Sequence, residues 1–111
     1  REETGIILAP DALQQICAPT RAGRNVKAPV VVQPYVFRLS ARPEVIIEEK
    51  EIDRHVWLAV HSFKDVANHR VVETMPGMIR PVFPMADYYI WGFTYGLLCR
   101  LLDVDQTLVS A

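Results

Sequence analysis

No stretch of the sequence stays apolar for long enough to cross a membrane. The longest candidate, residues 88–99, is interrupted by Gly92, Thr94 and Gly96, whereas a helix that spans a bilayer needs about 20 apolar residues. We therefore expect no membrane partner.

An excess of charge of one sign is also lacking. The 12 Lys and Arg residues nearly balance the 13 Asp and Glu residues, which gives a formal net charge of -1. Domains that bind nucleic acid usually present a strongly basic surface. We therefore expect no nucleic-acid partner, and any attraction of an anionic ligand has to come from a few local side chains.

Cysteine is scarce as well. Cys17 and Cys99 lie far apart in the sequence, and we expect two buried free thiols, as is typical of a reducing, cytoplasmic compartment. Three histidines, at positions 55, 61 and 69, do not share one helix face and are remote from both cysteines. The pattern therefore predicts no zinc site.

What is present fits a folded chain of one domain. Hydrophobic residues make up 50% of the 111 residues and charged residues 23%, which is typical of globular proteins rather than of disorder. The segment from Arg1 to Gly5 resembles the end of a helix, with Gly5 suited to the left-handed residue that closes it. Because one helical turn is not stable alone, we expect residues 1–111 to be a single domain that is truncated at its N-terminus.

Runs rich in β-branched and aromatic residues predict the strands. Pro34 lies inside the longest run and lacks an N–H, so it predicts a sheet edge or a bulge there. Apolar residues on both faces of 56–60 predict a buried strand. The predicted strands are 13–18, 30–39, 44–47, 56–60 and 70–75, followed by a Pro76-Gly77 turn and a further segment at 78–83.

Two helices are predicted in the second half of the chain. Ser62 and Asp65 have the spacing of a capping box, which predicts a short helix over 63–67. Apolar residues at helical spacing, including Trp91 and Tyr95, predict a closing amphipathic helix from about 89 to 103. We expect Trp91 and Tyr95 to pack in the core rather than to stack on a base. Strands with helices at both ends predict a layered α/β or α+β domain.

Basic residues occur in two places of interest. Arg21, Arg24 and Lys27 lie in one loop, where a polar turn is a commoner explanation than a phosphate site. Arg38 lies at the end of an apolar strand, so its head group has to reach solvent or an acidic partner.

The segment from Arg1 to Ile6 resembles the end of the Nudix box, in which two adjacent glutamates precede a glycine and a bulky aliphatic residue. Glu2 and Glu3 match the paired glutamates, and Gly5 matches the glycine. Further along, Glu51 and the segment 56–60 are similar to the acidic residue and the Trp-containing strand that follow the box in many Nudix proteins.

Residues 90–95, with the sequence Ile-Trp-Gly-Phe-Thr-Tyr, are similar to the start of the last helix of that family. The combination most resembles the coenzyme A pyrophosphatase-like branch. The resemblance implies an α/β fold, namely the C-terminal portion of a Nudix-type α/β/α sandwich with a mixed sheet and a closing C-terminal helix.

The resemblance also implies a metal site. Glu2 and Glu3 would bind Mg²⁺ or Mn²⁺, since hydrolysis of a diphosphate requires hard divalent ions held by carboxylates. Negative charge at the end of a helix is unfavourable, and a bound cation would compensate for it. From these two residues alone, solvated glutamates on a surface helix are the simpler interpretation.

Glu51 is the candidate general base, which would polarise the attacking water. It belongs to a run with Glu48 and Glu49 that by itself is typical of a solvated loop. The position of the base differs between branches of the family, and Glu49 is the alternative.

The resemblance therefore implies Mg²⁺-dependent hydrolysis of a nucleoside diphosphate linked to another group. The partner would be this small-molecule substrate, and a homodimer is left open. The alternative is a ligand-binding or interaction module without catalysis on the same scaffold. We expect the isolated 111-residue chain to be inactive and prone to association, because the rest of the box and the first strands would lie upstream of Arg1.

Overall fold

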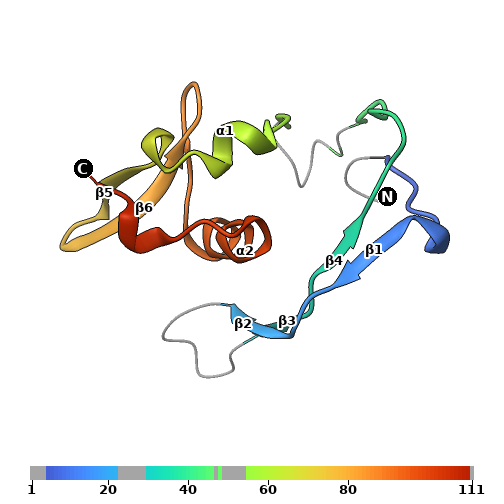
Figure 1. Cartoon of the computed structure of the whole chain (residues 1–111), viewed down its shortest axis with the longest axis horizontal. Helices are drawn as coiled ribbons and strands as arrows, with labels where there is room; N and C mark the ends of the chain where they lie inside the picture. The colour runs from blue at the N-terminus through green and yellow to red at the C-terminus, as the bar shows by residue number, and fades with distance from the viewer. Residues whose placement is uncertain (1–4, 23–29, 47, 49–54, 111) are drawn as a thin grey trace. The chain divides into compact units, whose positions relative to one another are not determined.

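A computed structural model of the chain describes residues 5–22, 30–46, 48 and 55–110. This part of the chain combines small antiparallel sheets with a few helices (Figure 1), which confirms the mixed α and β content. The chain divides into two compact units, residues 1–56 and 57–111.

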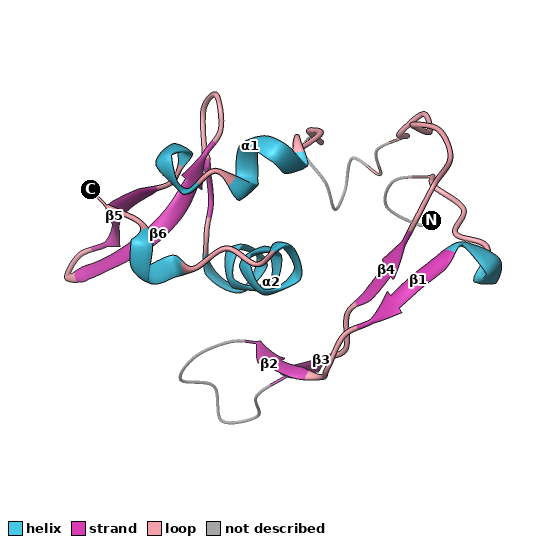
Figure 2. Cartoon of the chain, viewed as in Figure 1, coloured by secondary structure: helices cyan, strands magenta, loops and turns pink. Residues whose placement is uncertain are grey.

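The first unit consists of strand pairs in which successive segments fold back on each other (Figure 2). β1 pairs with β4 and β2 pairs with β3, and both pairs are antiparallel. At the junction of the two pairs, the N–H of Cys17 donates to the carbonyl of Pro34 at 2.9 Å. The elements are η1 (Pro10–Ala12), β1 (Leu13–Ile16), β2 (Thr20–Ala22), β3 (Val30–Val32) and β4 (Tyr35–Phe37).

The long strand predicted over 30–39 is divided in two at Pro34. Gln33 and Pro34 separate β3 from β4, because Pro34 has no N–H to donate to a neighbouring strand. The predicted strand 13–18 is present only as the shorter β1. Residues 44–46 have no regular structure, so the strand predicted there is wrong over these residues, while residue 47 lies outside the described part.

The second unit contains a three-stranded antiparallel sheet in the order β5-β6-β7, together with two α-helices. β5 and β6 are joined by the predicted Pro76-Gly77 turn, in which Gly77 has a φ of 79° that glycine adopts without a steric penalty. The elements are α1 (Val60–Lys64), η2 (Val66–Asn68), β5 (Arg70–Met75), β6 (Met78–Pro84), β7 (Tyr89–Ile90), α2 (Gly92–Leu102) and η3 (Gln106–Leu108).

The buried strand predicted over 56–60 is wrong. Residues 55–59 have no regular structure, and Val60 begins α1. An apolar alternation on both faces specifies a strand only where strands lie on either side of it, and Val56, Trp57 and Val60 stay 44 to 51% exposed.

Capping of the short helix also differs from the prediction. Ala59, not Ser62, precedes the first residue of α1, and no side chain caps that end. Asp65 instead caps η2, since its side chain accepts a hydrogen bond from the N–H of Ala67 at 3.0 Å. The predicted helix over 63–67 is therefore shifted and divided into α1 and η2.

The predicted closing helix is confirmed as α2, although it begins three residues later than the pattern suggested. Residues 89–90 form β7, which pairs with the end of β6 through Phe83 and Ile90. Trp91 precedes the first helical residue, and Asp103 ends α2 in the left-handed conformation with a φ of 56°.

The core of the second unit lies where α1, β6 and α2 meet. Each of these elements contributes an aromatic ring: Phe63, Phe83 and Tyr95 are 0%, 6% and 2% exposed. Cys99 packs with them, and smaller apolar side chains surround the cluster. Every fully buried side chain among the described residues belongs to this second unit.

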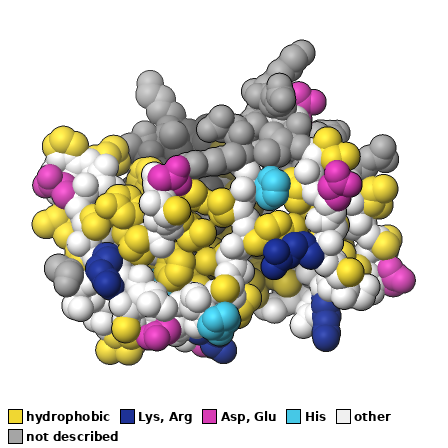
Figure 3. Space-filling model, turned by 90° about the horizontal axis from the view of Figure 1, so that it is seen from above, with side chains coloured by type: hydrophobic (Ala, Val, Ile, Leu, Met, Phe, Trp, Pro, Cys, Tyr) yellow, Lys and Arg dark blue, Asp and Glu magenta, His cyan; other side chains and the backbone are white. Residues whose placement is uncertain are grey.

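Large apolar side chains of the first unit reach the surface. Ile7, Val30, Val31 and Ile46 are 62 to 70% exposed. Hydrophobic side chains are also spread over the face of the molecule in Figure 3. The two cysteines are free thiols as predicted, with Cys99 buried and Cys17 half-buried.

Candidate functional site

The predicted metal ligands Glu2 and Glu3, the predicted base Glu51 and its alternative Glu49 all lie outside the described residues. Their neighbours in the sequence are described. Gly5, which follows the paired glutamates, has a φ of 75°, the left-handed conformation expected of it from the sequence.

Gly5 also lies against Ile46. A Cβ built on Gly5 would be 3.2 Å from the Cβ of Ile46, which is closer than side-chain carbons normally approach. The backbone angle thus favours glycine here, and a side chain at this position would in addition press against Ile46. The role of Ile46 could not be identified from the sequence, because the contact joins segments some 40 residues apart.

Of the basic candidates, Arg24 and Lys27 lie outside the described residues, and Arg21 is exposed on β2. Arg38 comes directly after β4. Its backbone N–H donates to the carbonyl of Ala12 at 2.8 Å, and this hydrogen bond continues the pairing of β1 with β4 by one step. The side chain of Arg38 is therefore held beside the start of β1.

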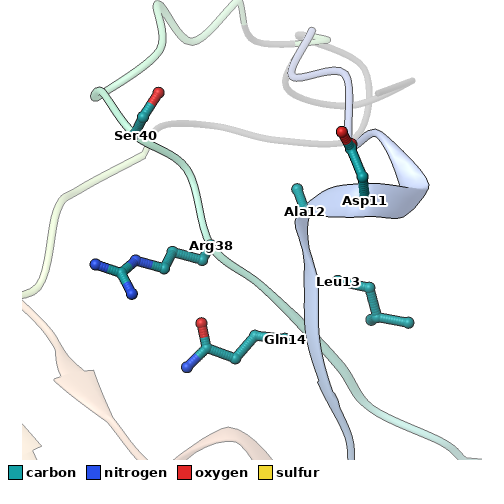
Figure 4. Close-up of a pocket in the computed structure, with 6 residues that line it drawn as sticks. All are labelled: Asp11, Ala12, Leu13, Gln14, Arg38 and Ser40. Atoms are coloured by element: carbon teal, nitrogen blue, oxygen red, sulfur yellow. The ribbon is translucent and has the colours of Figure 1, made fainter.

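Arg38 lines an open depression of about 490 Å³ in the first unit. Four polar side chains contribute to it, together with Ala12 and Leu13 (Figure 4). The four polar residues are Asp11, Gln14, Arg38 and Ser40. Only Arg38 was singled out in the sequence; the others come together through strand pairing, which no local pattern shows.

The second unit contains a buried polar cluster around His69, which is 1% exposed. Its Nε2 lies 2.5 Å from the backbone carbonyl of Phe63, and its Nδ1 lies 2.7 Å from the hydroxyl of Tyr95. Because a carbonyl only accepts hydrogen bonds, Nε2–H donates to Phe63 and Nδ1 accepts from Tyr95. Both ring nitrogens of His69 thus have a hydrogen-bond partner.

Aromatic rings enclose the same histidine. Its ring centroid lies 4.7 Å from that of Phe63 and 5.1 Å from that of Phe83, both in edge-to-face arrangements. Tyr95 packs in this core, as predicted, whereas Trp91 stays 45% exposed. The cluster connects α1, β6 and α2 and is closed to substrate.

The pKa values in this cluster argue against catalysis as well. Burial, with a hydrogen bond to Cys99 as a smaller cause, raises the pKa of the Tyr95 hydroxyl well above its ordinary value. Burial also raises the pKa of the Cys99 thiol. A protonated, buried thiol is a poor nucleophile, so the groups here stabilise the fold.

Within the described ranges, no three His, Cys, Asp or Glu side chains come close enough together to bind a metal ion. Each helix in that same part of the chain is too short or too polar to traverse a lipid bilayer. Comparisons with protein-family models, with curated proteins and with solved structures find no match to the chain. The functional argument therefore rests on the residues and contacts of the chain itself.

Proposed function

We propose that the chain forms part of a Nudix-type hydrolase that acts on nucleoside diphosphates linked to another moiety. The paired carboxylates of Glu2 and Glu3 contribute to a Mg²⁺ or Mn²⁺ site. Glu51 orients and deprotonates the attacking water, with Glu49 as the alternative base. A nucleotide and a phosphorylated remainder are the products.

The contact between Gly5 and Ile46 is the observation that supports this proposal most. Glu3 is two residues before Gly5, and Glu51 is five residues after Ile46. Two described residues that are close in sequence to the two acidic segments thus lie against each other. The left-handed conformation of Gly5 and the position of Trp91-Gly92 at the start of α2 agree with the resemblance at two further places.

The donor set fits the proposed metal chemically. Adjacent carboxylates offer hard oxygen ligands, which Mg²⁺ and Mn²⁺ prefer over nitrogen or sulfur. A bound ion of this kind supplies neutralisation of the charge on the diphosphate. The protein's own part is to hold the carboxylates and to position the water, which Glu51 does by accepting a proton from it.

The experiment is a hydrolysis assay on the full-length protein with Mg²⁺ and a panel of coenzyme A, ADP-ribose and NADH. We expect metal-dependent turnover of at least one of them and release of two phosphorylated products. The Glu3→Gln variant is expected to lose turnover and most of the stabilisation that Mg²⁺ gives, which for a single site at 100 times its Kd is about 2.7 kcal/mol.

Glu44→Gln is the matched control, because Glu44 is an exposed acid of the same unit that has no proposed role. If Glu3→Gln and Glu44→Gln respond equally to Mg²⁺, Glu3 is not a ligand. Tight binding of a nucleotide without any turnover would instead favour the alternative of a non-catalytic module.

A further inference from the structure

The depression beside Arg38 contains groups of opposite kinds at its two ends. Gln14 on β1 and Arg38 directly after β4 extend toward the same side (Figure 4). The register of β1 shifts between Leu13 and Gln15, so Gln14 lies at an irregularity in the strand pairing, and such irregularities redirect side chains. The remaining polar lining, Asp11 and Ser40, comes from η1 and from the chain beyond β4.

The four polar side chains of the depression make no hydrogen bond or ion pair with other parts of the described chain. No hydrogen bond or ion pair joins Asp11, Gln14, Arg38 or Ser40 to another side chain there. A guanidinium and an amide beside each other provide several N–H donors, which suit the oxygens of an anion. Their donors face a depression rather than a protein partner.

The acidic end limits what the anion can be. The carboxylate of Asp11 would repel a bare phosphate, but it accepts hydrogen bonds from hydroxyl groups. The volume of about 490 Å³ is also that of a pocket for a small organic molecule and far exceeds what one phosphate fills. A ligand that satisfies both ends carries a phosphate group and free hydroxyls.

We propose that this depression binds a phosphate ester with free hydroxyl groups, that is, a sugar phosphate or the ribose phosphate part of a nucleotide. Arg38 and Gln14 donate to the phosphate, and Asp11 accepts from the hydroxyls, while Ser40 lines the same depression. The site does not depend on the proposed hydrolysis, because binding here requires neither a metal nor turnover.

The test is calorimetric titration of the full-length protein, in the presence of a metal chelator, with ribose 5-phosphate, ribose and inorganic phosphate. We expect ribose 5-phosphate to bind at least about tenfold more tightly than either of its parts, since only it contacts both ends of the depression. Arg38→Gln is expected to weaken its binding by about tenfold or more, as for the loss of a charge-assisted hydrogen bond. Arg38→Lys keeps the positive charge but not the planar guanidinium with its paired N–H donors. We expect this variant to bind ribose 5-phosphate more weakly than the unsubstituted protein but more tightly than Arg38→Gln.

Two variants separate a specific site from general attraction by charge. Asp11→Asn is expected to weaken the binding of ribose 5-phosphate. The binding of inorganic phosphate should stay unchanged or become slightly tighter. Arg21→Gln removes another exposed charge of the same unit that does not line the depression, and it should have no effect on binding. Both arginines and Asp11 are exposed, so circular dichroism should show all variants folded.

The proposal is overturned if Arg21→Gln and Arg38→Gln weaken binding equally, or if ribose 5-phosphate binds no better than inorganic phosphate. It is also overturned if no binding is detected up to about 10 mM. Because the titration contains no metal, failure here leaves the hydrolysis assay unaffected, and failure of the assay leaves this site standing.

Discussion

The hydroxyl of Tyr95 on α2 donates to Nδ1 of His69, 2.7 Å away, in the core of the second unit. On the other side of the ring, Nε2–H donates to the carbonyl of Phe63 on α1. The buried side chain of His69 thus links α1 to α2 through one hydrogen bond from each ring nitrogen.

Tyr95→Phe should therefore destabilise the protein. The substitution keeps the ring but leaves Nδ1 of His69 buried without a donor, which costs about 1 to 3 kcal/mol. The change is measured by urea unfolding of the full-length protein. Tyr89→Phe is the control, since Tyr89 is 48% exposed, and equal effects of the two substitutions would show that the His69 contact adds nothing.

Stability should also fall at alkaline pH because of the same cluster. Burial raises the pKa of both Tyr95 and Cys99 in the folded chain. In an unfolded chain a cysteine ionises near pH 8.5 and a tyrosine near about 10. The folded state keeps protons that the unfolded state releases, so these groups favour folding below the unfolded pKa values, and stability declines as the pH rises above them.

The measurement is the midpoint of urea unfolding between about pH 7 and pH 11, which spans both unfolded pKa values. Tyr95→Phe and Cys99→Ala should each flatten the decline relative to the unsubstituted protein. A decline that is just as steep in the Tyr95→Phe, Cys99→Ala double variant would place its origin in other groups.

Much of the second unit could be predicted because its signals are local. The Pro76-Gly77 turn defines the β5-β6 hairpin, and the apolar spacing from Trp91 onward defines α2. Residues 56–60 show where prediction from local sequence fails. A short apolar run is compatible with a strand or with the segment before a helix, and the residues that pack against it in space decide between the two. Burial of Phe63 in the core favoured the helix.

The candidate site depends on contacts that no local pattern shows. His69 could be judged an unsuitable zinc ligand from its spacing, but its two hydrogen bonds involve residues 6 and 26 positions away. Gln14 similarly comes to lie near Arg38 only because β1 pairs with β4. Gly5 is the opposite case, because its left-handed conformation could be inferred from its place after a segment that the sequence predicts to be helical.

Gly5→Ala should destabilise the first unit and impair any activity that depends on it. A side chain in the left-handed region costs about 1 to 2 kcal/mol, and the new Cβ would lie 3.2 Å from that of Ile46. Limited proteolysis and unfolding measurements on the full-length protein would detect this loss.

An Ile46→Gly substitution in the Gly5→Ala background separates the two causes. It removes the whole opposing side chain, including the Cβ that makes the 3.2 Å contact, and leaves the backbone strain of Gly5→Ala in place. We expect at most partial recovery of stability. Full recovery would mean that the φ of Gly5 contributes nothing, and the absence of any effect from Gly5→Ala alone would contradict the contact.

Glu51→Gln should lower kcat of the full-length protein by at least about 100-fold if Glu51 is the general base, because the amide cannot accept the proton of the attacking water. The affinity for Mg²⁺ should stay unchanged, since the metal ligands are proposed to be Glu2 and Glu3. Glu49→Gln is the parallel variant, two residues away in the same acidic run. A large loss in Glu49→Gln with a small one in Glu51→Gln would transfer the role to Glu49, whereas unchanged kcat in both would place the base outside this run.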